Sequence, residues 1–184
     1  MLNIWELKSK ADKDKAEGKS GKKVTGAQLR VQKDVSELTL PDNMDVEFPD
    51  PNDLMHFRLR LIPDEGLYRN GHFSFDFSIN QNYPIEPPKV HCEQKIYHPN
   101  VDLMGNVCLN ILREDWKPVL SLDQVMVGLQ FLFLEPNQND PLNKDAARSL
   151  QQHPDVFAQE VTRAMRGGFV GSEVFDNVLG WNRR

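Results

Sequence analysis

The sequence has few cysteines and no long apolar run. Among its 184 residues only Cys92 and Cys108 carry thiols, which is too few for a disulfide framework, and their spacing is not that of zinc ligands, so we expect no metal site. Cys92 is expected to be buried at a strand end, as free cysteines usually are. No stretch approaches the roughly 18 apolar residues of a membrane helix, and the start MLNIWELK is too polar for a secretory signal. We therefore expect a soluble protein of a reducing, intracellular compartment.

The sequence also lacks an excess of positive charge. Its 27 acidic residues outnumber its 22 lysines and arginines, which gives a net charge of −5. Because nucleic-acid-binding domains usually carry a basic patch, we expect no nucleic-acid partner. Only residues 1–27 are basic, with seven lysines and four acidic residues. Within them, residues 8–26 hold almost no large apolar side chain and are expected to be disordered.

The first residues form a small apolar cluster at a free end. The cluster consists of Leu2, Ile4, Trp5 and Leu7. So few side chains cannot build a core, so the cluster either folds back on the body or docks into a partner. Trp5 favours docking, because aromatic anchors dominate the energies of interfaces.

The body of the chain changes from one hydrophobic period to another. Apolar residues at helical spacing predict a first helix that ends before Pro41. Alternation of apolar and polar residues then predicts four strands with glycine-containing turns. After Cys108 the helical period returns, and Ser121 with Gln124 forms a capping-box pattern. The expected elements are a helix at 27–38, strands at 45–48, 57–61, 73–79 and 89–92, helices at 122–133, 143–151 and 154–165, and a last short helix at 172–178.

This order of elements predicts an α+β fold. It consists of an N-terminal helix, a four-stranded antiparallel meander with one apolar face, and C-terminal helices. The length of the chain suits one domain with a tail. We therefore expect a flexible N-terminal docking extension at residues 1–26 and one domain at residues 27–184.

The stretch from residue 96 to 116, IYHPNVDLMGNVCLNILREDW, holds the candidate chemistry. Cys108 follows the turn signal Gly105-Asn106, so its thiol is expected at a surface. No His, Lys or Arg lies within four residues, so nothing local predicts a strongly lowered thiol pKa. Such a thiol suits an acyl group that arrives already activated as a thioester. Eight residues earlier, Asn100 offers an amide that could stabilise an oxyanion.

Several motifs in this order resemble the ubiquitin-conjugating enzyme family. They are residues 98–100 (HPN), Cys108, residues 116–118 (WKP), residues 83–88 (YPIEPP) and residues 136–142 (PNQNDPL). The resemblance covers most of the chain and implies the ubiquitin-conjugating fold. It also implies a transferase that carries a modifier's C-terminal glycine on Cys108 as a thioester and passes it to a substrate lysine. No bound cofactor is implied, because ATP is used by the activating enzyme.

The resemblance also suggests roles for single residues. Asn100 matches the asparagine that holds the oxyanion, and bracing of its own loop is the alternative. Asp140 matches the acidic residue that orients the lysine and eases its deprotonation, and a turn cap is the alternative. His98 is expected to bond its own loop rather than to act as a base. Two loops, with Ile85 at one tip and Pro118-Val119 at the other, match the surface that meets ligases.

Three features are similar to the family member dedicated to the cullin modifier, the neddylation enzyme. They are the apolar-tipped extension, residues 109–120 (LNILREDWKPVL) and residues 165–171 (MRGGFVG). There the extension docks on the heterodimeric activating enzyme through an aromatic residue and a leucine, matched by Trp5 and Leu7. The first residues, from Met1, enter a pocket of a cullin co-ligase. A RING-type ligase, cullin substrates and a cytoplasmic and nuclear location are further implications.

Other functions stay open at this point. One is a conjugating enzyme dedicated to ubiquitin. A second is a non-catalytic modifier-binding module, against which Cys108 argues. A third is a Cys-His hydrolase, which would need an imidazole near the sulfur, and only His98 is near in sequence.

Overall fold

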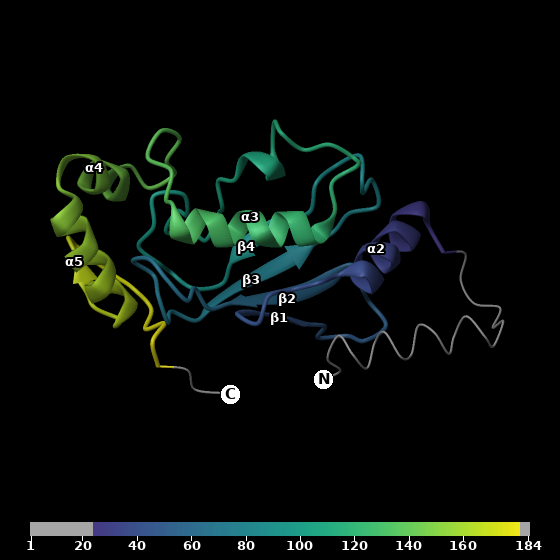
Figure 1. The fold of residues 1–184 in the computed structure, drawn as a ribbon, viewed down its shortest axis with the longest axis horizontal. Coiled ribbons are helices and arrows are strands. Elements are labelled where there is room, and N and C mark those ends of the chain that lie inside the picture. The colour runs from purple at the N-terminus through teal and green to yellow at the C-terminus, as the bar shows by residue number, and fades with distance from the viewer. Residues whose placement is uncertain (1–23, 181–184) are drawn as a thin grey trace.

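The computed structural model describes residues 24–180 (Figure 1). The apolar cluster from Met1 to Leu7 and nearly all of the expected extension lie outside the described residues. Within residues 24–180, no helix is long and apolar enough to cross a membrane.

The first described helix, α2 at Gly26–Glu37, confirms the helix expected at 27–38. Thr25 caps it, and the side chain of Gln28 completes a capping box with the Thr25 backbone. Ala27, Val31 and Val35 form its buried stripe.

The four expected strands form one antiparallel sheet in sequence order (Figure 1). Their alternating pattern places apolar side chains on one face. Phe73, Phe75 and Phe77 are buried, and across the ladder they pair with Leu61, Leu59 and Phe57. Charged side chains such as Arg58 and Asp76 occupy the other face. The strands are β1 at Met44–Glu47, β2 at His56–Leu61, β3 at Phe73–Ser78 and β4 at Lys89–Cys92.

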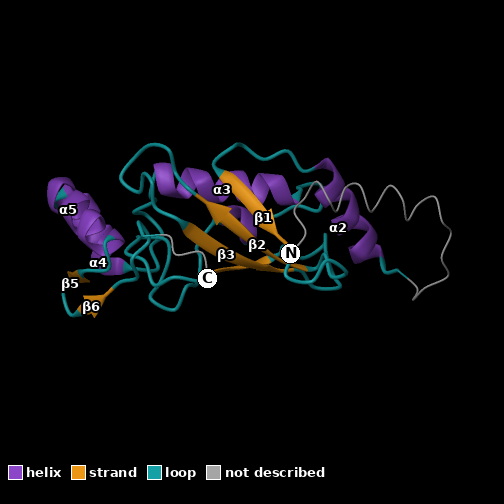
Figure 2. Cartoon of the chain, turned by 90° about the horizontal axis from the view of Figure 1, so that it is seen from below, coloured by secondary structure: helices purple, strands orange, loops and turns teal. Residues whose placement is uncertain are grey.

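Helix α3 at Leu122–Leu134 covers the apolar face of the sheet (Figures 1 and 2). Ser121 and Gln124 form the expected capping box at its start. Phe133 from α3 contacts Phe75 from β3, with ring centroids 5.9 Å apart. The central part of the core therefore lies between α3 and one sheet face, and buried residues of α2 and of a later helix, α5, extend it.

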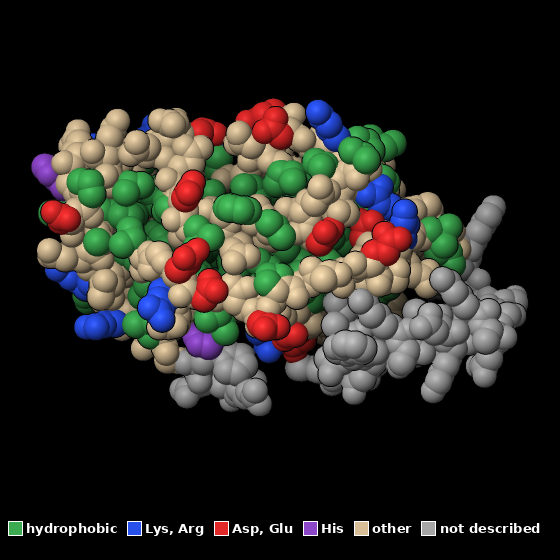
Figure 3. All heavy atoms as spheres, viewed as in Figure 1, with side chains coloured by type: hydrophobic (Ala, Val, Ile, Leu, Met, Phe, Trp, Pro, Cys, Tyr) green, Lys and Arg blue, Asp and Glu red, His purple; other side chains and the backbone are tan. Residues whose placement is uncertain are grey.

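Two further helices follow near the other end of the molecule (Figure 1). Helix α4 spans Lys144–Gln152, with Asn143 as its cap, and α5 spans Pro154–Met165. Both were expected from the sequence. On the face drawn in Figure 3, acidic side chains are spread among apolar ones.

The prediction of a last short helix at 172–178 is wrong. The chain instead forms a hairpin of β5 at Phe169–Val170 and β6 at Glu173–Val174 (Figure 2). Gly171 has φ of 59° at the first of two turn positions, where a left-handed conformation favours glycine. The dipeptide Gly171-Ser172 is thus a hairpin signal, and the interpretation of Ser172 as a helix start overlooked it.

Candidate active site

The loop before Cys108 folds back on itself and brings the cysteine beside Asn100. The backbone N–H of Cys108 donates to the carbonyl of Asn100 at 2.8 Å. Gly105 makes the return possible, because its φ of 87° is unfavourable for other residues. A Cβ atom at this position would also lie 2.2 Å from the carbonyl oxygen of Cys92. The expected turn at Gly105-Asn106 is therefore a tight crossing against β4.

Cys108 is not exposed, contrary to the sequence prediction. Only 5% of the residue is accessible, although it stands outside the main core cluster. The turn chemistry was interpreted correctly, but a segment 32 residues further along the chain approaches the thiol. Asp140 from this segment brings its Oδ2 to 3.3 Å from the Cys108 Sγ, and the thiol donates to it.

Arg113 is the third member of this group, which we call the thiol network: Cys108, Arg113 and Asp140. Its Nη2 donates to the same Oδ2 atom of Asp140. The Arg113 guanidinium, and then the thiol hydrogen bond, lower the pKa of Asp140. Burial first, and then the hydrogen bond to Asp140, raise the pKa of the Cys108 thiol, although Arg113 opposes the rise. At neutral pH the resting sulfur is therefore protonated beside an ionised carboxylate.

Asn100 braces the loop that carries Asp140. The residue is 1% exposed, and its Oδ1 accepts from the backbone N–H of Asn137 at 2.8 Å. Its Nδ2 donates to the carbonyl of Asn137 at 2.7 Å and points to that of Asp140 at 3.5 Å. The structure thus supports the bracing alternative for the resting molecule, and the oxyanion role stays a prediction.

His98 is a structural residue, as expected. It is fully buried, and its Nδ1 accepts from the backbone N–H of Asn100 at 2.9 Å. Its Nε2 therefore carries the hydrogen and donates to the carbonyl of Leu132 at 3.0 Å. Burial lowers the pKa of His98 to about 4. Because both nitrogens are occupied, this imidazole does not serve Cys108 as a base, and the hydrolase alternative loses its only nearby candidate.

The other cysteine and the histidines on the strands contact neighbours of their own. Cys92 is 1% exposed at the end of β4, as expected, and burial raises the pKa of its thiol to about 12. His56 contacts Asp53, and His91 contacts the carbonyl of Met104. Within residues 24–180, no group of three His, Cys, Asp or Glu side chains could hold a metal ion.

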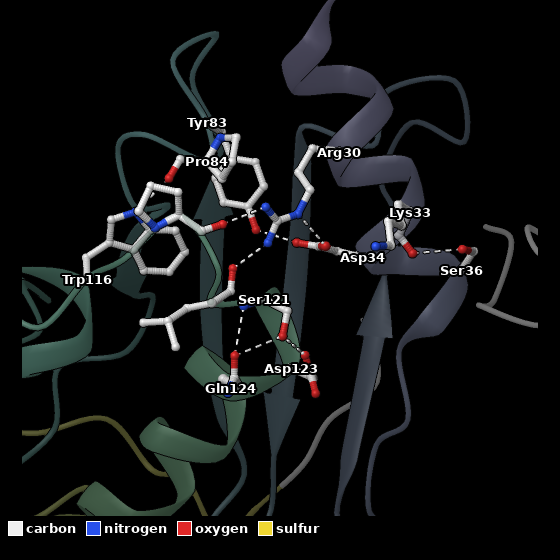
Figure 4. A network of polar contacts seen from close by, with 12 residues as sticks. Arg30, Lys33, Asp34, Ser36, Tyr83, Pro84, Trp116, Ser121, Asp123 and Gln124 are labelled. Atoms are coloured by element: carbon white, nitrogen blue, oxygen red, sulfur yellow. Dashed lines mark hydrogen bonds and ion pairs between the residues drawn. The ribbon is translucent and has the colours of Figure 1, made fainter.

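The two loops expected to meet ligases present exposed apolar tips. Ile85 is 76% exposed and Val119 is 81% exposed. The indole N–H of Trp116 donates to the carbonyl of Pro84 at 2.9 Å and so joins the two loops (Figure 4). Both tips are therefore held by a fixed scaffold, which favours weak, transient binding without a large ordering cost.

An ion pair between the partly exposed Arg30 and the buried Asp34 ties the same loops to α2, and the sequence analysis missed it. Arg30 donates to the carbonyls of Pro118 at 2.7 Å and Leu120 at 2.5 Å, and its Nε contacts Asp34 at 2.8 Å (Figure 4). The Asp34 carboxylate also accepts from the hydroxyl of Tyr83. We call Arg30, Asp34 and Tyr83 the Arg30 network. One signal was available, because Asp34 falls within the buried stripe of α2.

Known proteins resemble this chain over nearly its whole length. Residues 30–165 match the ubiquitin-conjugating enzyme family. The chain is 60% identical over 180 residues to the NEDD8-conjugating enzyme UBC12 of Yarrowia lipolytica, covering 97% of this chain and 99% of that protein. It is 54% identical over 179 residues to the Nedd8-conjugating enzyme UbcE2M of Drosophila melanogaster, with the same coverage of 97% and 99%. The solved structure of S. cerevisiae Ubc12 matches with a TM-score of 0.83 at 43% identity, covering 97% of this chain and 100% of that one.

Proposed function

The chain belongs to the ubiquitin-conjugating enzyme family, and from this membership we propose that it conjugates NEDD8 to substrate lysines. It is a transferase that works through thioester intermediates. The observation that carries the proposal is the similarity to NEDD8-conjugating enzymes across the catalytic domain and most of the N-terminal extension. We propose Cys108 as the acceptor, because its thiol lies beside the acidic side chain of Asp140.

Two transfers make up the reaction. In the first, the Cys108 sulfur loses its proton and bonds to the carbonyl carbon of the modifier's last residue. The sulfur of the activating enzyme leaves and takes up a proton. In the second, a deprotonated lysine amine bonds to the same carbon, and the Cys108 sulfur leaves as a thiolate that is then protonated. Because one thioester replaces another, Cys108 can be charged without ATP or another cofactor bound to this chain.

The nearby polar residues have distinct roles in this proposal. Asp140 orients the incoming amine, because a carboxylate near the sulfur attracts the lysine ammonium. As a proton acceptor it also eases deprotonation of the amine. Asn100 holds the Asp140 segment in place through its bonds to Asn137. In the tetrahedral intermediate, the Asn100 amide is also proposed to stabilise the oxyanion.

The proposal includes several partner surfaces. Ile85, Pro118 and Val119 are proposed to meet a RING-type ligase, because their tips are apolar and firmly held. Trp5 and Leu7 are proposed to dock on the heterodimeric activating enzyme. The first residues, Met1, Leu2 and Ile4, are proposed to enter a cullin co-ligase. Cullins are the proposed substrates, in cytoplasm and nucleus.

A charging reaction tests the function. The protein is mixed with ATP and either NEDD8 or ubiquitin, each with its own activating enzyme. We expect a NEDD8 adduct that disappears under thiol reductants, with little ubiquitin adduct. Equal or stronger charging with ubiquitin would identify a ubiquitin-dedicated enzyme. Binding without an adduct would identify a module, and cleavage of a modifier fusion would identify a hydrolase.

A truncation tests the extension. A chain that begins at Val24 keeps Thr25, the cap of α2, so the thermal midpoint should stay nearly unchanged. Half-maximal charging should need more enzyme, because one docking site on the activating enzyme is gone. The double variant Trp5→Ala, Leu7→Ala should reproduce most of this charging defect. Replacement of the lysines of the extension by serine should reproduce little of it. Markedly earlier unfolding of the truncated chain would instead mean that the extension packs on its own domain.

A further inference from the structure

Arg113 stands on a short, well-anchored turn next to the cysteine. The 3-10 helix η1 at Asn110–Leu112 begins two residues after Cys108, and the backbone N–H of Arg113 donates to the carbonyl of Asn110 at 2.9 Å. Leu109 directly precedes η1 and packs closely on α3. A Cβ atom added to Gly128 of α3 would lie 3.3 Å from the Leu109 side chain. The backbone that presents Arg113 is therefore held against the central helix.

Asp140, in contrast, depends on its side-chain partners for its position. Its carboxylate is 58% exposed, and a single oxygen, Oδ2, accepts from both the Cys108 thiol and the Arg113 guanidinium. Among residues 24–180, Oδ1 has no hydrogen-bond partner. An exposed aspartate without partners exchanges among rotamers, so these two contacts determine where the carboxylate lies.

Thioester formation changes this arrangement in a defined way. A thiol donates one hydrogen bond, but a thioester sulfur carries no proton and donates none. Charging therefore removes one of the two contacts of Asp140 and leaves the other. The remaining contact is the one to Arg113, and the carboxylate is needed at this moment, when the lysine approaches.

We propose that Arg113 is a positioning residue for lysine transfer, a role that rests on the function proposed above. Its guanidinium keeps the Asp140 carboxylate beside the sulfur after thioester formation has removed the thiol proton. The vacated side of the carboxylate then accepts the lysine ammonium. Misplacement of a catalytic group by about 1 Å can cost on the order of 10²-fold in rate, so loss of one anchor should be measurable.

The test follows transfer from preformed Cys108 thioester to free lysine in single turnovers at several lysine concentrations. We expect Arg113→Gln to lower the second-order rate constant about 10-fold, with charging by the activating enzyme preserved. Arg113→Lys should recover part of the rate, because a single ammonium keeps the charge but not the planar geometry of the guanidinium. Arg148→Gln on α4, which loses an exposed pair with Asp145, should match the wild type.

A double-mutant cycle separates this role from a structural one. If Arg113 acts through Asp140, Arg113→Gln should have no further effect on transfer in an Asp140→Ala background. A full 10-fold loss in that background, or a wild-type rate for the single variant, would overturn the proposal. Both outcomes require that the wild type is charged and discharged. Failure of the wild type to charge with NEDD8 would instead count against the proposed function.

Discussion

Two arginine–aspartate pairs in this chain have nearly opposite surroundings. In the Arg30 network, the Asp34 side chain is 4% exposed and the arginine also binds two backbone carbonyls. In the thiol network, the Asp140 side chain is 58% exposed and shares its oxygen with a thiol. The first pair joins α2 to two loops, whereas the second lies over Cys108, the proposed acceptor of the modifier.

The difference indicates what each pair can do. A pair with a buried carboxylate is costly to break, because a partly buried guanidinium and the buried hydroxyl of Tyr83 lose their shared acceptor. An exposed pair contributes little to stability and is screened by salt, so its carboxylate can exchange one partner for another. The Arg30 network is thus suited to holding a surface in shape, and the thiol network to a reaction in which contacts change.

The largest expected effect is a loss of lysine transfer without a loss of folding, on substitution of Cys108 in the thiol network. Cys108→Ser should fold normally but lose lysine transfer completely, because the oxygen ester that forms is a poorer acyl donor than a thioester. Gel analysis should show an adduct that resists thiols and is cleaved by hydroxylamine. Cys92→Ser is the matched control and should still form a thioester. If only Cys92→Ser abolished charging, Cys92 would carry the thioester and the assignment to Cys108 would be wrong.

The second effect should appear in rate and not in stability. Asp140→Ala should slow transfer to free lysine by on the order of 10²-fold, the lower range for lost acid–base assistance, while charging continues. The same change should lower the pKa of the Cys108 thiol, because the carboxylate helps to raise it. Alkylation of the uncharged enzyme near pH 7 should then be faster. Unchanged discharge across pH would reduce Asp140 to a turn residue.

The third effect should appear in stability and not in intrinsic rate. Asp34→Ala leaves Arg30 and Tyr83 without their shared acceptor, so we expect the free energy of unfolding to fall by about 3 kcal/mol. Urea unfolding measures this loss. Asp145→Ala, which breaks an exposed pair on α4, should leave the transition in place. If Asp34→Ala were as stable as Asp145→Ala, the contrast between the two networks would not hold.

The smallest effect is the dependence of the free energy of unfolding on acidic pH. It tests His98, the buried residue that supports the loop of the thiol network. His98 has a pKa of about 4 in the folded protein, against 6.5 ordinarily. The unfolded chain therefore binds the extra proton first, and stability falls as pH drops from 6.5 towards 4. Between pH 7 and 5 the expected loss is about 2 kcal/mol. Urea unfolding of His98→Gln should show a flatter dependence, whereas the exposed variant His153→Gln should keep it.

Local patterns in the sequence account for most of the fold. The stripe on α2, the capping box at Ser121 and the alternation from Phe73 to Phe77 each report one element, and each was interpreted correctly. The hairpin turn at Gly171-Ser172 carried an equally local signal, so its misassignment was avoidable. Periodicity is informative wherever neighbours along the chain determine the structure.

Only part of the candidate site could be predicted from the sequence, because the residues that contact one another there are distant along the chain. Arg113 lies five residues after Cys108, just outside its four nearest neighbours on either side, and no local pattern indicates that Asp140 covers the thiol. Arg30 lies 88 residues from the carbonyl of Pro118 that it binds. The resemblance to a family identified Asn100, Cys108 and Asp140 as a set. Their exposure and mutual bonds required coordinates.

The bonds made by residues 98–100 have a consequence for hydrogen exchange. The Pro99 carbonyl accepts from the amides of Leu142 and Asn143, and the Asn100 side chain holds the amide of Asn137. These bonds join the cysteine loop to the segment after α3 and do not belong to any helix or strand. Opening of that segment alone would dismantle the site while the sheet stays closed. The amides of Asn137 and Leu142 should therefore exchange together, and earlier than those of β2 and β3.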